Sequence, residues 1–364
     1  VSMAVGRPCQ IHSAAAQGSF TVLRVIHRYL LLATFTFILA AIAVFLVISW
    51  HLDTPMQVGE DEFVFTVPSG SSLTLLSLSL ADKGMLKWPD VLILWSRMTG
   101  QSTIKAGEYK LQPGDTPREL LNMLTEGRVV QHQITFPEGL RFAEWLHLLN
   151  QQPGLVKLLP GLSGDEVIKT LSLEIEHPEG WFFPDTYSYS YGDSDRDILS
   201  QAHQRMQAVL AEEWQQRTPD LPFNSPYEAL ILASIVEKET GGTSERGEIA
   251  GVFVRRLKRG MKLQTDPTII YGLGDDYQGY IKRRHLQKAT PYNTYIINGF
   301  PPTPIAMPGR GAIHAVLNPQ EGDSLFFVAK GDGSHYFSAS YEEHLKAVQK
   351  FQLQRRSDYR STPR

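Results

Sequence analysis

The sequence has a single cysteine, Cys9, among 364 residues. One thiol forms no intrachain disulfide, and it builds neither a thiolate zinc cluster nor a redox pair. The chain also has no excess of one charge, since 35 Lys and Arg stand against 38 Asp and Glu, a net charge of -3. This balance provides no basic surface for nucleic acid, so we expect no nucleic-acid partner.

Two common hydrolase patterns are missing as well. The 11 histidines form no H-x-H pair and no H-E-x-x-H helix, and no G-x-S-x-G segment marks a serine nucleophile. We therefore expect no metal and no cofactor. A hydrophobic fraction of 42% nevertheless suffices for buried cores, and the length allows two or three domains.

A long hydrophobic run is the strongest local signal. Residues 29–50 hold no charged side chain, and 22 residues of helix reach roughly 33 Å, enough for a bilayer core of about 30 Å. A cleaved signal peptide and a buried core helix are the alternatives, but signal peptides have shorter apolar segments, so we favour an uncleaved anchor. The positive-inside rule then predicts a cytoplasmic tail at 1–28 and an extracytoplasmic remainder. The flanking charges are Arg7, Arg24 and Arg28 before the run, and Asp53, Glu60, Asp61 and Glu62 after it.

Residues 51–130 have the pattern of a small α+β module. A strand at 63–67 is followed by a turn and a helix at 73–81. A second strand at 108–111 leads to the capping box of Thr116 and Glu119, which opens a helix that Gly127 ends. This arrangement resembles a LysM-like, membrane-proximal domain.

Residues 131–353 predict a second α+β domain. A strand at 133–136 precedes a helix that carries Phe142, Trp145, Leu146 and Leu149 on one face. Four aromatic residues within 179–187 are expected mainly in the core, although such rings also stack on sugars. Further signals are a helix from Ser194 to Trp214, a hairpin of 325–329 with 335–338, a helix capped by Ser340, and an aperiodic tail at 354–364.

One helix carries the candidate catalytic acid. Ser225 and Glu228 form a capping-box pattern, and residues 229–236 are apolar on every side, which predicts a fully buried helix. Glu237 continues one buried stripe, whereas Glu239 lies about 200° round the helix. Burial and the negative helix end should raise the pKa of Glu237, as a general acid requires. From spacing alone, a solvated last turn before Gly241 and Gly242 is the alternative.

Seven segments in this part of the chain resemble the endolytic murein transglycosylase (YceG-like) family. The resemblance implies that Glu237 is the catalytic acid and that the substrate is peptidoglycan. It further implies an inner-membrane enzyme with its catalytic domain in the periplasm, endolytic cleavage that terminates strand elongation, and peptidoglycan synthases as partners. The segments are Ala233–Thr240, Ser244–Arg246, Val252–Leu257, Met261–Thr268, Thr290–Tyr295, Gly299–Pro302 and Pro304–Ala306.

The implied reaction is lytic and needs one carboxyl group. The acid protonates the oxygen between N-acetylmuramic acid and N-acetylglucosamine, and its carboxylate then takes the C6 hydroxyl proton, which closes a 1,6-anhydro ring. Asp266 followed by Pro267 is also an N-cap pattern, and Asn and Thr often bond local backbone. The polar residues expected to contact sugar are Gln264, Thr265, Asp266, Tyr292, Asn293 and Thr294.

Two other functions stay open from the residues. A membrane-anchored, non-catalytic peptidoglycan-binding scaffold would need only the LysM-like module. Simple hydrolysis would need a second carboxylate, for which the sequence offers Glu239, Glu245 and Asp266.

Overall fold

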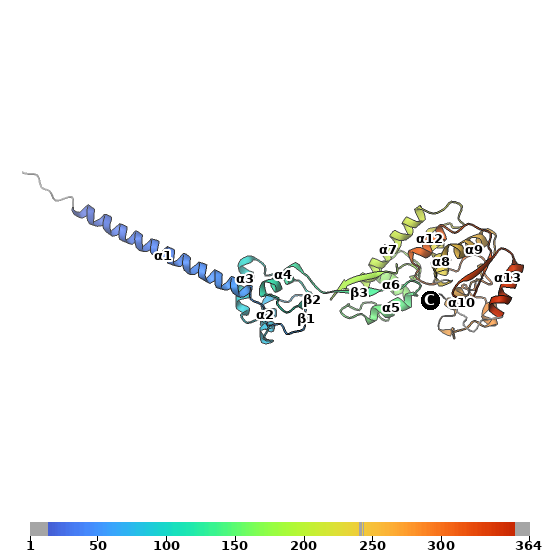
Figure 1. The fold of residues 1–364 in the computed structure, drawn as a ribbon, viewed down its shortest axis with the longest axis horizontal. Coiled ribbons are helices and arrows are strands. Elements are labelled where there is room, and N and C mark those ends of the chain that lie inside the picture. Colours follow the sequence, from blue (N-terminus) through green and yellow to red (C-terminus); the bar gives the residue numbers. More distant parts are fainter. Residues whose placement is uncertain (1–13, 240–241, 243, 354–364) are drawn as a thin grey trace, which may run out of the picture. The chain divides into compact units, whose positions relative to one another are not determined.

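The computed structural model describes residues 14–239, 242 and 244–353, with side chains from residue 25 onward. The chain divides into two compact units, Val1–Val130 (unit 1) and Gln131–Arg364 (unit 2). Helices and antiparallel two-stranded sheets occur in both (Figure 1). The predicted α+β class with one long apolar N-terminal helix is confirmed. The predicted tail at 354–364, Arg7, Gly241 and the side chain of Arg24 lie outside the described residues.

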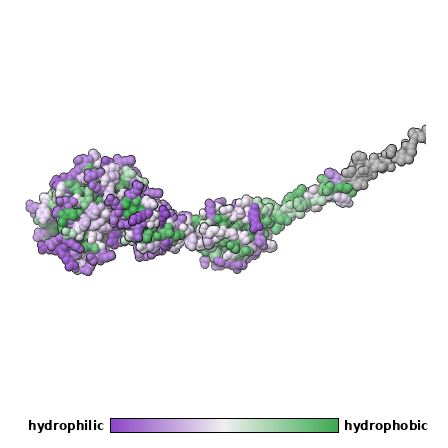
Figure 2. Space-filling model, turned by 180° about the vertical axis from the view of Figure 1, so that it is seen from behind, coloured by the Kyte–Doolittle hydropathy of each residue, from purple (hydrophilic) through white to green (hydrophobic). Residues whose placement is uncertain are grey.

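The long helix α1 (Ala14–Leu52) begins before the predicted anchor and ends two residues after it. Since no proline stands between Pro8 and Pro55, nothing forces a break where charged residues precede the apolar run. The stretch apolar enough to cross a membrane is Val25–Leu52, 28 residues with high hydropathy. Its side chains from Val25 to Val47 are exposed and mostly hydrophobic (Figure 2). One such helix is consistent with a single-pass membrane anchor.

Unit 1 follows the order strand, helix, helix, strand, helix. β1 (Phe63–Val67) pairs antiparallel with β2 (Gly107–Leu111). Between them lie α2 (Leu73–Asp82) and α3 (Pro89–Thr99), and α4 (Pro117–Glu126) follows β2. The predicted capping box of Thr116 with Glu119 opens α4, and Gly127 ends it in a left-handed conformation. The helix α3 was not predicted from the sequence.

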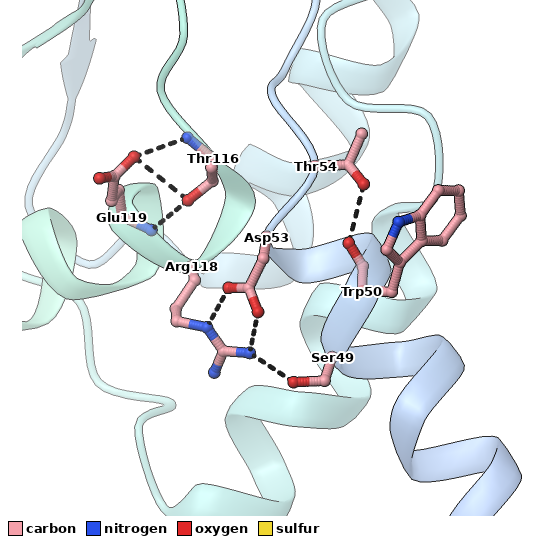
Figure 3. Close-up of polar contacts among 7 residues, drawn as sticks. All are labelled: Ser49, Trp50, Asp53, Thr54, Thr116, Arg118 and Glu119. Atoms are coloured by element: carbon pink, nitrogen blue, oxygen red, sulfur yellow. Dashed lines mark hydrogen bonds and ion pairs between the residues drawn. The ribbon is translucent and has the colours of Figure 1, made fainter.

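The C-terminal end of α1 packs into the core of unit 1. Leu52 has no exposed surface and packs in a core with Phe65, Tyr109 and Leu120. The Arg118 guanidinium of α4 donates from Nε to Asp53 Oδ1 at 2.6 Å and from Nη2 to Ser49 Oγ at 3.1 Å (Figure 3). These contacts fix the last turn of the helix to the unit.

The first half of unit 2 is built around one core. β3 (Gln131–Thr135) pairs antiparallel with β4 (Thr186–Ser190) and is covered by α5 (Phe142–Gln151) and α6 (Gly164–Leu171). The expected core role of the aromatic segment is confirmed, since Phe182, Phe183 and Tyr187 are at most 8% exposed. α7 (Asp195–Gln215) starts at a capping box of Ser194 and leads into the second core.

The second half of unit 2 surrounds α8 (Pro226–Glu239). Its residues 229–236 are all buried, as predicted, because α7, α9 and α12 pack around them (Figure 1). The expected capping box is half formed: the Glu228 N–H donates to Ser225, but the Glu228 carboxylate accepts from the Asn224 N–H instead. The remaining elements are α9 (Arg246–Lys258), α10 (Asp266–Leu273), η1 (Gly274–Asp276), α11 (Arg283–Gln287), α12 (Arg310–Leu317), the predicted hairpin of β5 (Phe326–Ala329) and β6 (His335–Ser338), α13 (Tyr341–Val348) and η2 (Gln349–Leu353).

Candidate active site

Glu237 lies in the last turn of α8 with only 5% of its side chain exposed. Its Oε1 accepts from Arg246 Nη2 at 2.9 Å, and its Oε2 accepts from the Gly309 N–H at 3.0 Å. Arg246 is the first residue of α9, and Gly309 is the N-cap of α12. The carboxylate is therefore held where the C-terminal end of one helix meets the start of two others.

A second carboxylate shares the same guanidinium. Glu138 Oε2 lies 3.1 Å from Arg246 Nη2, and this side chain is 44% exposed. Since both contacts involve one nitrogen, Glu138 Oε2 and Glu237 Oε1 are at most 6.0 Å apart, the sum of the two distances. Glu138 belongs to the turn after β3, which is tied down by the Gly139 N–H donating to Met307 O at 2.8 Å.

The first turn of α12 approaches this group too closely for side chains. A Cβ on Gly309 would lie 1.7 Å from Glu138 Oε1, and one on Gly311 would lie 2.5 Å from Arg246 Nη1. Glycine at both positions lets the helix start bring its free N–H groups to a carboxylate, which they stabilise. Sequence reasoning missed Glu138, Arg246 and Gly309; the Pro-Gly-x-Gly phrase at 308–311 was the available signal.

Opposing effects set the pKa of Glu237. Burial is the largest, and it raises the pKa above the ordinary value. The Gly309 N–H and the Arg246 charge lower it, while the Glu138 charge raises it. The net direction is upward, which keeps more of this carboxyl protonated near neutral pH than a hydrated glutamate would be.

Glu239 faces a different set of groups. Its Oε1 accepts from the Thr265 hydroxyl, and burial raises its pKa to about 7. Glu245, another carboxylate considered for hydrolysis, accepts from the backbone N–H of His335 at 3.0 Å and contacts the His335 ring at 2.8 Å. Neither of these carboxylates shares the guanidinium that joins Glu237 to Glu138.

The segment 264–266 borders the Glu239 side of α8. Gln264 is exposed and has a positive φ of 53°, while Thr265 is 2% exposed. The prediction that Asp266 is an N-cap is wrong, because Thr265 takes that position. Asp266 is therefore the first residue of α10 and Pro267 the second. The Asp266 carboxylate is exposed and accepts from the Tyr295 hydroxyl at 2.7 Å.

The segment 292–294 is largely internal. The Asn293 amide donates to three backbone carbonyls, those of His285, Leu286 and Lys288, and the residue is 1% exposed. Thr294 has no exposed surface, and its hydroxyl lies 2.9 Å from that of Thr268. Tyr292 is half-buried with its hydroxyl 2.8 Å from Thr303 Oγ1. In this conformation Asn293 and Thr294 hold the loop together and have no surface for a sugar.

The described parts of the chain hold no group of three His, Cys, Asp or Glu side chains placed to bind a metal ion.

Comparison with known proteins gives one consistent family. The sequence model of the YceG-like family matches residues 65–350. The endolytic murein transglycosylase of Bacillus subtilis (strain 168) is 30% identical over 302 residues, 78% of this chain and 83% of that protein. The one of Streptococcus pneumoniae serotype 2 is 27% identical over 81% of this chain, which spans 59% of that protein. A crystal structure of a yceG-like protein from Listeria monocytogenes aligns with a TM-score of 0.48 and 28% identity, over 79% of this chain and 99% of that one.

Proposed function

This chain belongs to the YceG-like family, and on that premise we propose that it is a lytic transglycosylase that cleaves the glycan strands of peptidoglycan. Two relatives named endolytic murein transglycosylases, one of them matched over 83% of its length, support a peptidoglycan transglycosylase role. The finer proposal concerns the bond, the products and the residues. It is cleavage between N-acetylmuramic acid and N-acetylglucosamine, with Glu237 as the single acid and base.

The observation that carries this assignment is the buried Glu237 carboxyl with one hydrogen-bond donor on each oxygen. In the first step its proton passes to the glycosidic oxygen, and the bond from that oxygen to the muramoyl C1 breaks. In the second step the Glu237 carboxylate takes the proton of the C6 hydroxyl, whose oxygen bonds to C1. The products are an N-acetylglucosamine hydroxyl end and a 1,6-anhydro end, and no water is consumed.

The surroundings of Glu237 suit both steps. Burial raises the pKa, which favours the protonated form that the first step uses. Once the proton has left, Arg246 and the Gly309 N–H stabilise the carboxylate without rearranging, as preorganised donors do. One group therefore serves as acid and then as base.

Hydrolysis is the second candidate, and Glu138 is the observation that favours it. Retaining glycosidases hold their two carboxyl groups about 5 to 5.5 Å apart, and inverting ones about 6.5 to 9.5 Å. The limit of 6.0 Å between the nearest oxygens of Glu138 and Glu237 is compatible with a paired mechanism. In that case Glu138 would act as nucleophile or as base for water. Each cleavage would consume one water molecule and leave a reducing N-acetylmuramic acid end in place of the anhydro end.

We also propose that α1 is retained as a membrane anchor. A signal sequence cleaved after the apolar run would remove Ser49 or Leu52, yet Leu52 lies in the core of unit 1 and Ser49 accepts from Arg118. The basic residues before the run and the acidic ones after it support a cytoplasmic N-terminus and a periplasmic catalytic unit.

Several finer roles remain part of the proposal. Unit 1 is a LysM-like glycan-binding module, cleavage is endolytic and terminates strand elongation, and peptidoglycan synthases are partners. Of the six predicted sugar contacts, exposure best supports Gln264 and Asp266.

The test is product analysis of purified sacculi incubated with the detergent-solubilised full chain. Lytic cleavage yields anhydro-ended fragments, whereas hydrolysis yields fragments heavier by one water, about 18 Da, which mass spectrometry separates. Release of neither product, with glycan binding retained, would favour the non-catalytic scaffold.

A further inference from the structure

Helix α3 carries an apolar stripe that the described chain covers only in part. Leu94 is 50% exposed and Met98 66%, and the partly buried Val91 and Trp95 share their face, since the spacing is i, i+3, i+4, i+7. The buried face of the helix is a different one, formed by Leu92 and Ser96. α3 therefore has one apolar face for the core of unit 1 and another that is left exposed.

This helix runs beside the end of α1 in the opposite direction. Just before its first residue, the Trp88 ring lies 5.6 Å from the ring of His51. Seven residues later along α3, the Trp95 ring lies 5.9 Å from the ring of Phe45, which precedes His51 in α1. Advancing along α3 thus means moving back along α1 toward its apolar middle. Met98, one turn after Trp95, lies still further in this direction.

Counting from either end of the apolar run places Phe45 within the hydrocarbon core of the bilayer. A bilayer core takes about 20 helical residues, so a span that starts at Tyr29, the first residue after the charged Arg28, includes Phe45. Asp53 marks the end of α1 that lies in water outside the bilayer. The Arg118 hydrogen bond holds the pKa of the Asp53 carboxyl below the ordinary value and so keeps this side chain charged. Eight residues of helix put Phe45 about 12 Å below Asp53, more than the roughly 5 to 7 Å of the headgroup region.

We infer that α3 is a membrane-docking helix whose stripe of Leu94, Trp95 and Met98 inserts into the surface of the bilayer that α1 spans. The inference rests on the proposal that α1 is a membrane anchor. The occupant of the stripe is phospholipid, because α1 continues from the membrane directly into contact with α3. Two helices, α1 and α3, then hold unit 1 at the bilayer surface, so that unit 1 does not move freely at the end of α1.

The residues around the stripe have the chemistry of a membrane interface. Trp88 and Trp95 are the side-chain type that gathers at the headgroup level. Arg118 lies over the Trp95 ring at 5.0 Å while it binds Asp53, so its charge stays on the water side. Arg97 is exposed three residues after Leu94, so it borders the stripe, and its side chain is long enough to reach the headgroups.

Spin labels at three positions of the full-length protein test the inference. In a Cys9→Ser background, single nitroxides are attached at Met98→Cys, Val64→Cys and Leu39→Cys, and the protein is reconstituted in vesicles of phosphatidylethanolamine and phosphatidylglycerol. Val64 is the matched control, an apolar residue 48% exposed on β1, which lies on the side of unit 1 away from α1 (Figure 1). Leu39 lies in the middle of the apolar run of α1.

Collision rates with oxygen and with a water-soluble nickel chelate report the depth of each label. We expect the label at 98 to collide with nickel several-fold less often than the label at 64, and with oxygen more often. Equal nickel collisions at 98 and 64, with 39 protected, would overturn the docking of α3 and leave the anchor intact. Free access of nickel to position 39 would overturn the anchor and the docking with it.

Discussion

Replacing Glu237 by glutamine tests the central assignment with the smallest change of shape. The glutamine keeps the volume of the side chain but carries no transferable proton. General acid–base catalysis contributes about 10²- to 10⁴-fold to a rate, so kcat should fall by that factor, equivalent to about 3 to 5 kcal/mol of transition-state stabilisation.

The same substitution has a structural cost that can be worked out from the donors. Both carboxylate oxygens of Glu237 accept, one from Arg246 and the other from the Gly309 N–H. A glutamine amide turns its NH₂ group toward one of these donors, which leaves a buried donor without an acceptor and costs about 1 to 3 kcal/mol. Unit 2 should therefore melt a few degrees lower while remaining folded.

Glu239→Gln is the matched control in the same helical turn. Its carboxyl is also shifted upward in pKa, but it binds the Thr265 hydroxyl and not Arg246, and an amide oxygen can accept that bond. We expect cleavage of sacculi near the wild-type rate. The assay is release of soluble fragments, quantified by mass spectrometry at several enzyme concentrations. Cleavage by Glu237→Gln within about tenfold of wild type would refute the assignment, given the usual size of acid catalysis.

Three further substitutions test the surroundings. Glu138→Gln removes a charge that raises the pKa of Glu237, so the alkaline limb of the pH–rate profile should move to lower pH while anhydro products persist; loss of all cleavage would instead point to the paired mechanism. Burial raises the pKa of Glu179 to about 7 from 4.5, so its contribution to stability is full below about pH 4.5 and is lost as pH rises through 7. Raising the pH from 4 to 8 should therefore lower the stability of wild type by about 3 kcal/mol more than that of Glu179→Gln, measured by denaturant unfolding. Arg118→Met removes partly exposed bonds to Asp53 and Ser49, so unit 1 should lose at most about 1 kcal/mol, and hydrogen exchange at Ser49–Asp53 should be faster.

Local features of the fold were predictable because they depend on neighbouring residues. The capping box of Thr116 with Glu119 and the glycine that ends α4 are complete within twelve residues of sequence. The buried body of α8 was predictable for a similar reason, since seven of the eight residues 229–236 are apolar and leave no polar face to expose. In both cases the signal and the structure it specifies lie in the same segment.

α3 escaped prediction because its apolar pattern is ambiguous. The run Val91–Trp95 is continuous, short, and contains β-branched and aromatic residues, so it fits a buried strand as well as a helix. Its two apolar faces remove the periodicity that would have identified a helix. The Asp266 prediction failed by a single position, because Thr265 and Asp266 are both good N-caps and the sequence does not choose between them.

The environment of Glu237 was out of reach for a different reason. Arg246 is nine residues from Glu237, but Glu138 is 108 residues from Arg246 and Gly309 is 72 from Glu237. Only the tertiary packing of α8, α9 and α12 brings these groups together. The sequence therefore identified the acid candidate and its burial but not its partners.

Those partners change how the proton affinity of Glu237 should be understood. Burial and the C-terminal end of α8 alone would favour a permanently neutral carboxyl, which donates a proton well but is a poor base afterwards. The N-terminal end of α12, reaching the carboxylate through the Gly309 N–H, opposes the end of α8, and Arg246 adds a full positive charge. Glu138 in turn shares that charge and weakens its effect on Glu237. A group that must give up a proton and recover another in one turnover needs both forms to be accessible, and this arrangement of opposed charges supplies that condition.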